Sequence, residues 1–196
     1  MKATLMTVCL SALLAVATVR ANEAAPTLPH IEIQTSEGRI LIKLDPFAAP
    51  LTVSHILSLV DEKFFDGLVF HRVISGFMIQ GGGYTPDYEL KEDERTVPNE
   101  SGNNLSNTRG TIAMARTADP HSAASQFFIN LVDNRQLDPA KTAANGRWGY
   151  AVFGTVIEGM AVADRIAAVP TGRTDELNDV PEVPVVIESV RRFVPE

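Results

Sequence analysis

The sequence FHRVISGFMIQGGG at residues 70–83 determines the fold more than any other part of this 196-residue chain. Its aromatic and β-branched residues are typical of buried strands, and Ser75-Gly76 interrupts them with a turn signal. The segment is therefore predicted to fold back on itself as two strands. Such a reversal would bring the side chains of Arg72 and Gln80 together, because these residues flank the turn.

Arg72 is the residue of this segment that points to function. A charge inside an apolar run costs free energy unless it has a partner or belongs to a site. Because Phe77 and Met78 lie just beyond the turn, the segment predicts a site that combines a guanidinium, the Gln80 amide and an apolar wall.

Two later segments have the same character. TIAMAR at residues 111–116 and SQFFIN at residues 125–130 each place polar groups at the ends of an apolar strand. Together with residues 70–83, these two segments are the candidates for a catalytic or binding site.

The remaining elements are short and lack a regular β-α-β alternation. A hairpin is predicted around the turn at residues 36–38, one helix from Pro50 and a second helix after Gly159. Strands are expected at residues 31–35, 40–44, 68–80, 111–115, 126–132, 150–156 and 183–190. This pattern favours an antiparallel barrel or sandwich with helices outside it.

Composition narrows the class of protein. The length suits a single domain, and 45% hydrophobic with 21% charged residues is ordinary for a globular protein. The formal net charge of −7 argues against nucleic acid as a partner. The single cysteine excludes an intrachain disulfide framework.

Residues 1–21 are predicted to be a signal peptide, and residues 22–29 a flexible lead-in to the folded domain. A positive start at Lys2 precedes an apolar run at residues 3–19 and small residues near Ala21. A membrane anchor is the alternative, although the run is at the lower limit of a spanning helix. Cleavage would remove the only cysteine, which suits an oxidising compartment, and would leave no membrane segment.

Other chemistries lack their sequence patterns. His71 is interpreted as a buried histidine rather than a metal ligand, because no H-x-x-x-H or acid-histidine set accompanies it. The glycines at residues 81–83 do not belong to a phosphate-binding loop. Ser122 and Ser125 near His121 lack the G-x-S-x-G context of a hydrolase. The sequence therefore predicts neither a metal nor another cofactor.

Three segments together resemble the cyclophilin family of peptidyl-prolyl cis–trans isomerases. They read FHRVISGFMIQGGG, NTRGTIAMARTADPHSAASQFFI and GYAVFGTVIEGM, and the resemblance runs in order from about residue 31 to residue 190. The predicted signal peptide and the motif TRGTIAMARTAD are similar to those of bacterial periplasmic members in particular.

This resemblance implies a mainly β protein: a closed eight-stranded antiparallel barrel capped by two α-helices, formed by one domain at residues 30–196. It implies an isomerase that acts on X-Pro bonds in proline-containing peptides and unfolded polypeptides of the periplasm. A monomer is a separate expectation, because the predicted barrel is small and acidic. Arg72 and Gln80 match the catalytic positions. The matching substrate-binding positions are Phe77, Met78, Ala115, Gln126, Phe128, Leu137 and Tyr150.

The sequence departs from the family pattern at three positions. Gln136 replaces a tryptophan that contacts cyclosporin, so weak binding of this drug is expected. Tyr150 replaces a groove histidine, and Ser75 replaces a proline in the turn. Two alternatives remain: a module that only binds proline segments, and a silent scaffold, against which the retained arginine and pocket argue. The polar loop at residues 139–148 is interpreted as a surface loop.

Overall fold

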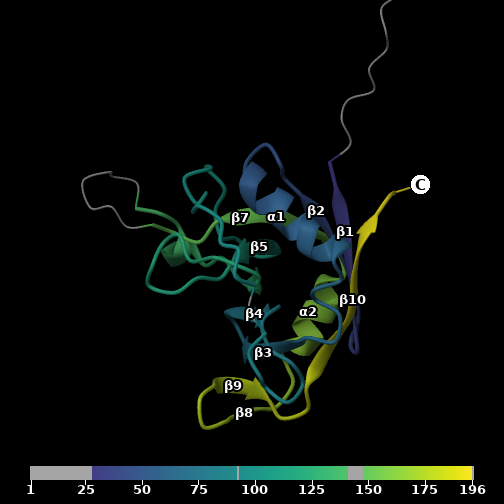
Figure 1. Ribbon diagram of the computed structural model, residues 1–196. Helices are drawn as coiled ribbons and strands as arrows, with labels where there is room; N and C mark the ends of the chain where they lie inside the picture. The colour runs from purple at the N-terminus through teal and green to yellow at the C-terminus, as the bar shows by residue number, and fades with distance from the viewer. Residues whose placement is uncertain (1–27, 92, 141–147, 196) are drawn as a thin grey trace, which may run out of the picture.

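Eight strands close into an antiparallel barrel in the order β1-β10-β3-β4-β6-β5-β7-β2 (Figure 1). The computed structural model describes residues 28–91, 93–140 and 148–195. The predicted signal peptide, most of the lead-in and most of the loop at residues 139–148 lie outside these residues. The barrel strands are β1 His30–Thr35, β2 Gly38–Leu44, β3 Val69–Ile74, β4 Met78–Gly81, β5 Thr111–Met114, β6 Phe127–Asn130, β7 Val152–Glu158 and β10 Val185–Phe193.

The predicted hairpin at the start of the domain is confirmed. Ile31 pairs with Ile42 and Ile33 with Ile40, and all four side chains are buried. The Thr35 hydroxyl closes the turn, because it donates to the Gly38 carbonyl at 2.7 Å. Alternate residues of the two strands therefore face one core, as the period of two requires.

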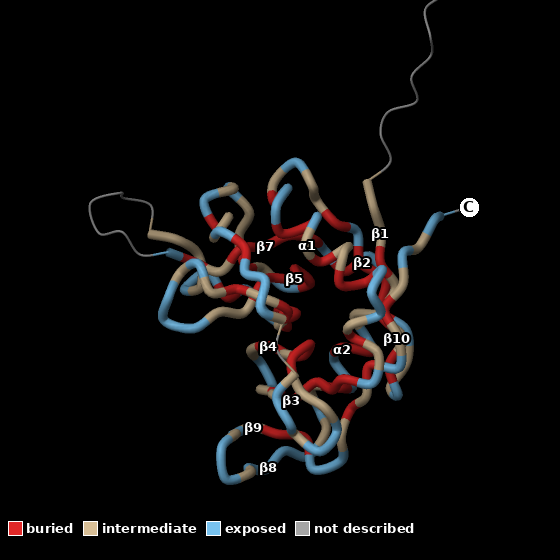
Figure 2. Tube along the Cα trace, viewed as in Figure 1, coloured by how far each residue is buried: buried red, intermediate tan, exposed pale blue. Residues whose placement is uncertain are grey.

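Two α-helices cover this core, as predicted. Helix α1 (Pro50–Asp61) begins with proline in its first turn, where no N–H is needed. Helix α2 (Met160–Ile166) follows Gly159, whose φ of +91° and close approach to the Arg39 carbonyl leave no room for a Cβ. Figure 2 shows the buried residues gathered on the strands and on the inner sides of the helices. The helices contribute Val53, Ile56, Leu59, Val60, Val162, Ala163 and Ile166 to the core.

One part of the fold was not predicted. Strands β8 (Thr171–Arg173) and β9 (Asn178–Pro181) form a separate two-stranded sheet, which lies below β3 in Figure 1. The following strand begins at Val185 rather than Val183, because Pro184 lacks the N–H that a ladder needs. In the described part of the chain, no helix is long and apolar enough to span a membrane.

Candidate active site

The strand register aligns one row of side chains on the outer face of the barrel. Arg72 of β3 pairs with Gln80 of β4, which pairs with Phe128 of β6. Phe128 then pairs with Ala113 of β5, and Ala113 with Val152 of β7. Directly paired residues point to the same side of a sheet. Residues that are 80 positions apart in the sequence therefore form one continuous row.

The Phe128 end of this row is an apolar slot. Met78, Ala113, Phe128 and Val152 form a buried cluster that is separate from the barrel core. Phe77, Leu137 and Tyr150 pack around this cluster while they stay partly exposed. The Tyr150 ring meets Phe128 edge to face, with centroids 5.6 Å apart. The slot thus has a buried floor and aromatic walls.

Buried amides fix the walls of the slot. The Asn134 side chain donates to the Phe77 carbonyl at 2.8 Å. The Asn107 side chain donates to the Tyr150 carbonyl at 3.2 Å, and the Tyr150 N–H donates to the carbonyl of Leu137, in the 3-10 helix η1 (Arg135–Leu137). Hydrogen bonds of this kind hold the three walls at a constant spacing.

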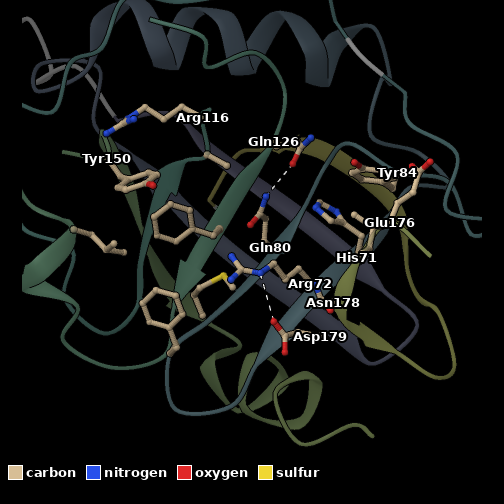
Figure 3. Close-up of a pocket in the computed structure, with 16 residues that line it drawn as sticks. His71, Arg72, Gln80, Tyr84, Arg116, Gln126, Tyr150, Glu176, Asn178 and Asp179 are labelled. Atoms are coloured by element: carbon tan, nitrogen blue, oxygen red, sulfur yellow. Dashed lines mark hydrogen bonds and ion pairs between the residues drawn. The ribbon is translucent and has the colours of Figure 1, made fainter. Parts of the chain in front are cut away.

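The other end of the row is polar. Gln80 donates to the side-chain oxygen of Gln126 at 2.9 Å. The Arg72 Nε lies 3.7 Å from Oδ2 of Asp179, in β9, and Figure 3 shows both contacts as dashed lines. The Arg72 side chain is 42% exposed, so its guanidinium is accessible to a ligand that occupies the slot.

The slot and the polar end form one cavity of about 460 Å³. It is lined by all nine residues that the sequence predicted for the site: Arg72, Phe77, Met78, Gln80, Ala115, Gln126, Phe128, Leu137 and Tyr150. A second cavity of about 440 Å³ adjoins it and shares Gln80, Ala115, Arg116 and Gln126. The four shared residues join the two cavities into one groove.

Arg116 is a lining residue that was not predicted for the site. Its guanidinium lies 4.6 Å from the centre of the Tyr150 ring and donates to the carbonyls of Thr117, Trp148 and Gly149. A charged residue directly after the TIAMA strand was the available signal, but its partner is 34 positions away. Trp148 itself packs against His121, and it does not line either cavity.

His71 also lines the cavity, from behind the polar end. Its ring is buried against Tyr84, with centroids 4.4 Å apart. Burial, together with the nearby positive charge of Arg72, lowers the pKa of His71 to about 4. The imidazole is therefore neutral at physiological pH. The described residues contain no cluster of histidine, cysteine and acidic side chains that could hold a metal.

Residues 176–179 of the β8–β9 hairpin complete the cavity wall. They were missed because residues 171–182 show neither the alternation of a buried strand nor a catalytic motif. The only sequence feature that could have indicated their role is the polar pair Asn178-Asp179 directly before a Val-Pro sequence.

Comparisons with known proteins show the family of the chain. The family model described as "Cyclophilin type peptidyl-prolyl cis-trans isomerase/CLD" matches residues 30–192. A peptidyl-prolyl cis-trans isomerase of Streptomyces antibioticus is 52% identical over 161 residues, which cover 82% of this chain and 96% of that protein. Peptidyl-prolyl cis-trans isomerase B of Escherichia coli is 49% identical over 160 residues, covering 82% and 97%.

The fold has solved counterparts as well. A crystal structure of a Cryptosporidium parvum cyclophilin type isomerase superposes with a TM-score of 0.70 at 23% identity, covering 86% of this chain and 99% of that one. This likeness confirms the predicted barrel, and the family match confirms the resemblance. The chain belongs to the cyclophilin-type peptidyl-prolyl cis-trans isomerases.

Proposed function

We propose that this isomerase accelerates X-Pro rotation in folding secreted or periplasmic proteins, by non-covalent stabilisation of the twisted peptide bond. The observation that carries the proposal is the row of paired residues, which sets the Arg72 guanidinium beside the slot floored by Phe128. No covalent intermediate is required for such a rotation.

The reaction is slow without a catalyst because the peptide bond has partial double-bond character. The barrier to rotation is about 18–20 kcal/mol, and exchange at X-Pro bonds takes tens to hundreds of seconds. Twisting the bond breaks the resonance and returns a lone pair to the prolyl nitrogen. A group that interacts with this lone pair binds the twisted state more strongly than either planar state, and differential binding of this kind lowers the barrier.

Arg72 is suited to that interaction. Its guanidinium keeps its charge and presents several N–H donors in a rigid fork. Gln80, directly opposite in the ladder, has its amide N–H directed to Gln126, so its own carbonyl oxygen is available to a substrate N–H. We assign donation to the prolyl nitrogen to Arg72 and orientation of the substrate backbone to Gln80.

The slot holds the proline ring while the acyl side turns. Its apolar lining by Phe77, Met78 and Phe128 fits a pyrrolidine ring and excludes water, which strengthens the interaction with Arg72. A second Cryptosporidium parvum structure was solved in the presence of the dipeptide Ala-Pro. We extend that ligand chemistry to this chain, with proline-containing and unfolded polypeptides as substrates.

The periplasmic location rests on the sequence of residues 1–21, and the monomeric state on the small acidic barrel. N-terminal sequencing of the exported protein tests the location, since the mature chain is expected to start near Asn22. Size-exclusion chromatography tests the monomeric state, and a dimer would contradict it.

Weak cyclosporin binding is part of the proposal. Gln136 is exposed on η1, and its amide donates to Asn134 at 3.3 Å, where the family tryptophan would offer an indole. Titration of the isomerase activity with cyclosporin should therefore show weaker inhibition of this protein than of its Gln136→Trp variant. Equal inhibition of the two proteins would contradict this part.

The decisive experiment removes the guanidinium. Arg72→Ala should nearly abolish isomerisation of a proline tetrapeptide in a protease-coupled assay, while the melting temperature stays close to that of the wild type because Arg72 is half-exposed. A variant with wild-type activity would remove Arg72 from the mechanism. The same variant separates catalysis from binding: if it still suppresses aggregation of unfolding proteins, the groove also holds chains without isomerising them.

A further inference from the structure

The β8–β9 hairpin is fixed against the strand that carries the catalytic arginine. Strand β9 lies against β3, and its Val180 side chain is buried. The Tyr88 hydroxyl donates to the Pro181 carbonyl at 2.8 Å, which ties the end of β9 to the loop that follows β4. These contacts hold the hairpin in place as one wall of the candidate site, although it lies outside the barrel.

The backbone of β9 is irregular at Asp179. Gly172 pairs with Val180 and Arg173 with Asn178, so Asp179 is an extra residue without a partner in the pairing. Its φ is +59°, in the left-handed region that side chains other than those of asparagine and aspartate rarely adopt. Bulges of this type redirect a side chain and occur next to active sites. Here the bulge directs the Asp179 carboxylate towards Arg72 (Figure 3).

The contact between the two charges is loose. Asp179 Oδ2 lies 3.7 Å from Arg72 Nε, beyond hydrogen-bond distance. By contrast, Arg95, Arg191 and Arg192 contact their carboxylate partners at 2.6–2.7 Å. Among the described residues, no hydrogen bond engages the Arg72 guanidinium. The carboxylate thus attracts the guanidinium without using up its hydrogen-bond donors, which stay available to a substrate.

We propose that Asp179 is a positioning residue, which holds the Arg72 guanidinium over the slot through this ion pair. The inference rests on the proposed role of Arg72 in catalysis. A long, half-exposed arginine side chain has several rotamers of similar energy, and only those near the slot reach the prolyl nitrogen. A charge on the hairpin side favours these rotamers before the substrate binds, so its effect falls on the rate of rotation rather than on binding.

The test compares two isosteric removals of charge from the same hairpin. Asp179→Asn introduces a residue that also tolerates a positive φ. Asp175→Asn is the matched control, because it removes an exposed carboxylate from the same hairpin that does not line the cavity. With a neutral proline tetrapeptide, kcat of Asp179→Asn should fall about two- to fivefold at unchanged KM, the size expected for an exposed ion pair. Asp175→Asn should behave like the wild type.

Salt gives an independent reading. At about 1 M NaCl the screening length is about 3 Å, so the wild-type kcat should fall towards that of Asp179→Asn, which should not change. Asp179→Gly removes the carboxylate at a backbone angle that glycine prefers, so a similar loss in this variant assigns the effect to the charge rather than to strain.

Three results would overturn the proposal: wild-type kcat in Asp179→Asn, an increase in its kcat, or an equal loss in Asp175→Asn. The Arg72→Ala variant keeps the two hypotheses distinguishable. If Arg72→Ala is inactive and Asp179→Asn is unaffected, only the positioning role fails. If Arg72→Ala is fully active, the proposed mechanism itself fails.

Discussion

The two faces of strands β4, β5 and β6 have different roles: one packs the core and the other lines the candidate site. Towards the inside, Ile79, Ile112 and Ile129 pair with one another and are at most 1% exposed in the main core. Towards the outside, their immediate neighbours form the row that leads from the slot to Arg72. Side chains alternate along a strand, so neighbouring residues of one strand point to opposite faces. In this protein the inner face packs the core and the outer face lines the candidate site.

The two faces also differ in how their side chains are held. The inner residues are packed on all sides by the barrel and both helices. The outer cluster is small, and one side of it is open to the cavity. Substitutions on the inner face should therefore reduce the free energy of unfolding, whereas substitutions on the outer face should mainly reduce activity.

The largest expected effect is on the inner face. Ile129→Ala should lower the free energy of unfolding by about 2–5 kcal/mol, because it leaves a cavity in a core that cannot collapse onto it. Denaturant unfolding measures this loss. Below the unfolding transition, the KM for a proline peptide should stay close to the wild-type value.

Phe77→Ala is the matched change on the outer face. Phe77 is partly exposed, so the loss of stability should be smaller than for Ile129→Ala, while kcat/KM should fall because the slot loses an aromatic wall. An equal loss of stability in the two variants would contradict the division of tasks between the faces.

A third prediction concerns His71, which is buried and lines the polar end of the cavity. The groups that face it are Tyr84, Arg72 and Gln126, none of which supplies a negative charge. Its pKa is about 4 in the folded protein and 6.5 ordinarily. Protonation therefore favours the unfolded chain. The resulting contribution, about 3 kcal/mol, is complete above pH 6.5 and is lost as the pH falls to 4.

Unfolding in denaturant at a series of pH values between 4 and 7 measures this dependence. The His71→Gln variant is the control, because its side chain does not titrate and its stability should change much less over this range. The carboxylates that pair with arginines, such as Asp66 with Arg191, have lowered pKa values and lose their contributions below pH 4. A wild-type stability that is constant from pH 7 to pH 4 would contradict the burial of a neutral imidazole.

The Arg72–Gln80 end of the outer row was predictable from local sequence, whereas Phe128 followed from the resemblance to the family. The turn at Ser75-Gly76 fixes the register of β3 on β4, and this register places Arg72 opposite Gln80. The barrel followed from the order of the three segments that resemble the family. The β8–β9 hairpin was not predictable in this way, since its residues are mostly exposed and carry no alternation. The position of Asp179 depends on a bulge, which a pattern of apolar residues does not encode.

Arg116 was missed for a related reason, and it gives the smallest expected effect. Its guanidinium is held by three carbonyls on the rim and lies against the outer side of the Tyr150 ring. An exposed cation–π contact contributes about 0.5–1 kcal/mol. Arg116→Gln should therefore loosen this wall and raise the KM for a proline peptide about two- to fivefold, with little change in kcat.

Arg116→Lys sharpens the test, because lysine keeps the charge but cannot donate to three carbonyls from one rigid plane. Its KM should fall between those of the wild type and Arg116→Gln. If Arg116→Gln instead lowered the melting temperature as much as Ile129→Ala and left KM unchanged, Arg116 would be a structural residue of the rim. An increase in KM at constant stability would mean that Arg116 keeps the Tyr150 wall in position without contributing to stability, whereas the inner-face residues contribute to stability by packing.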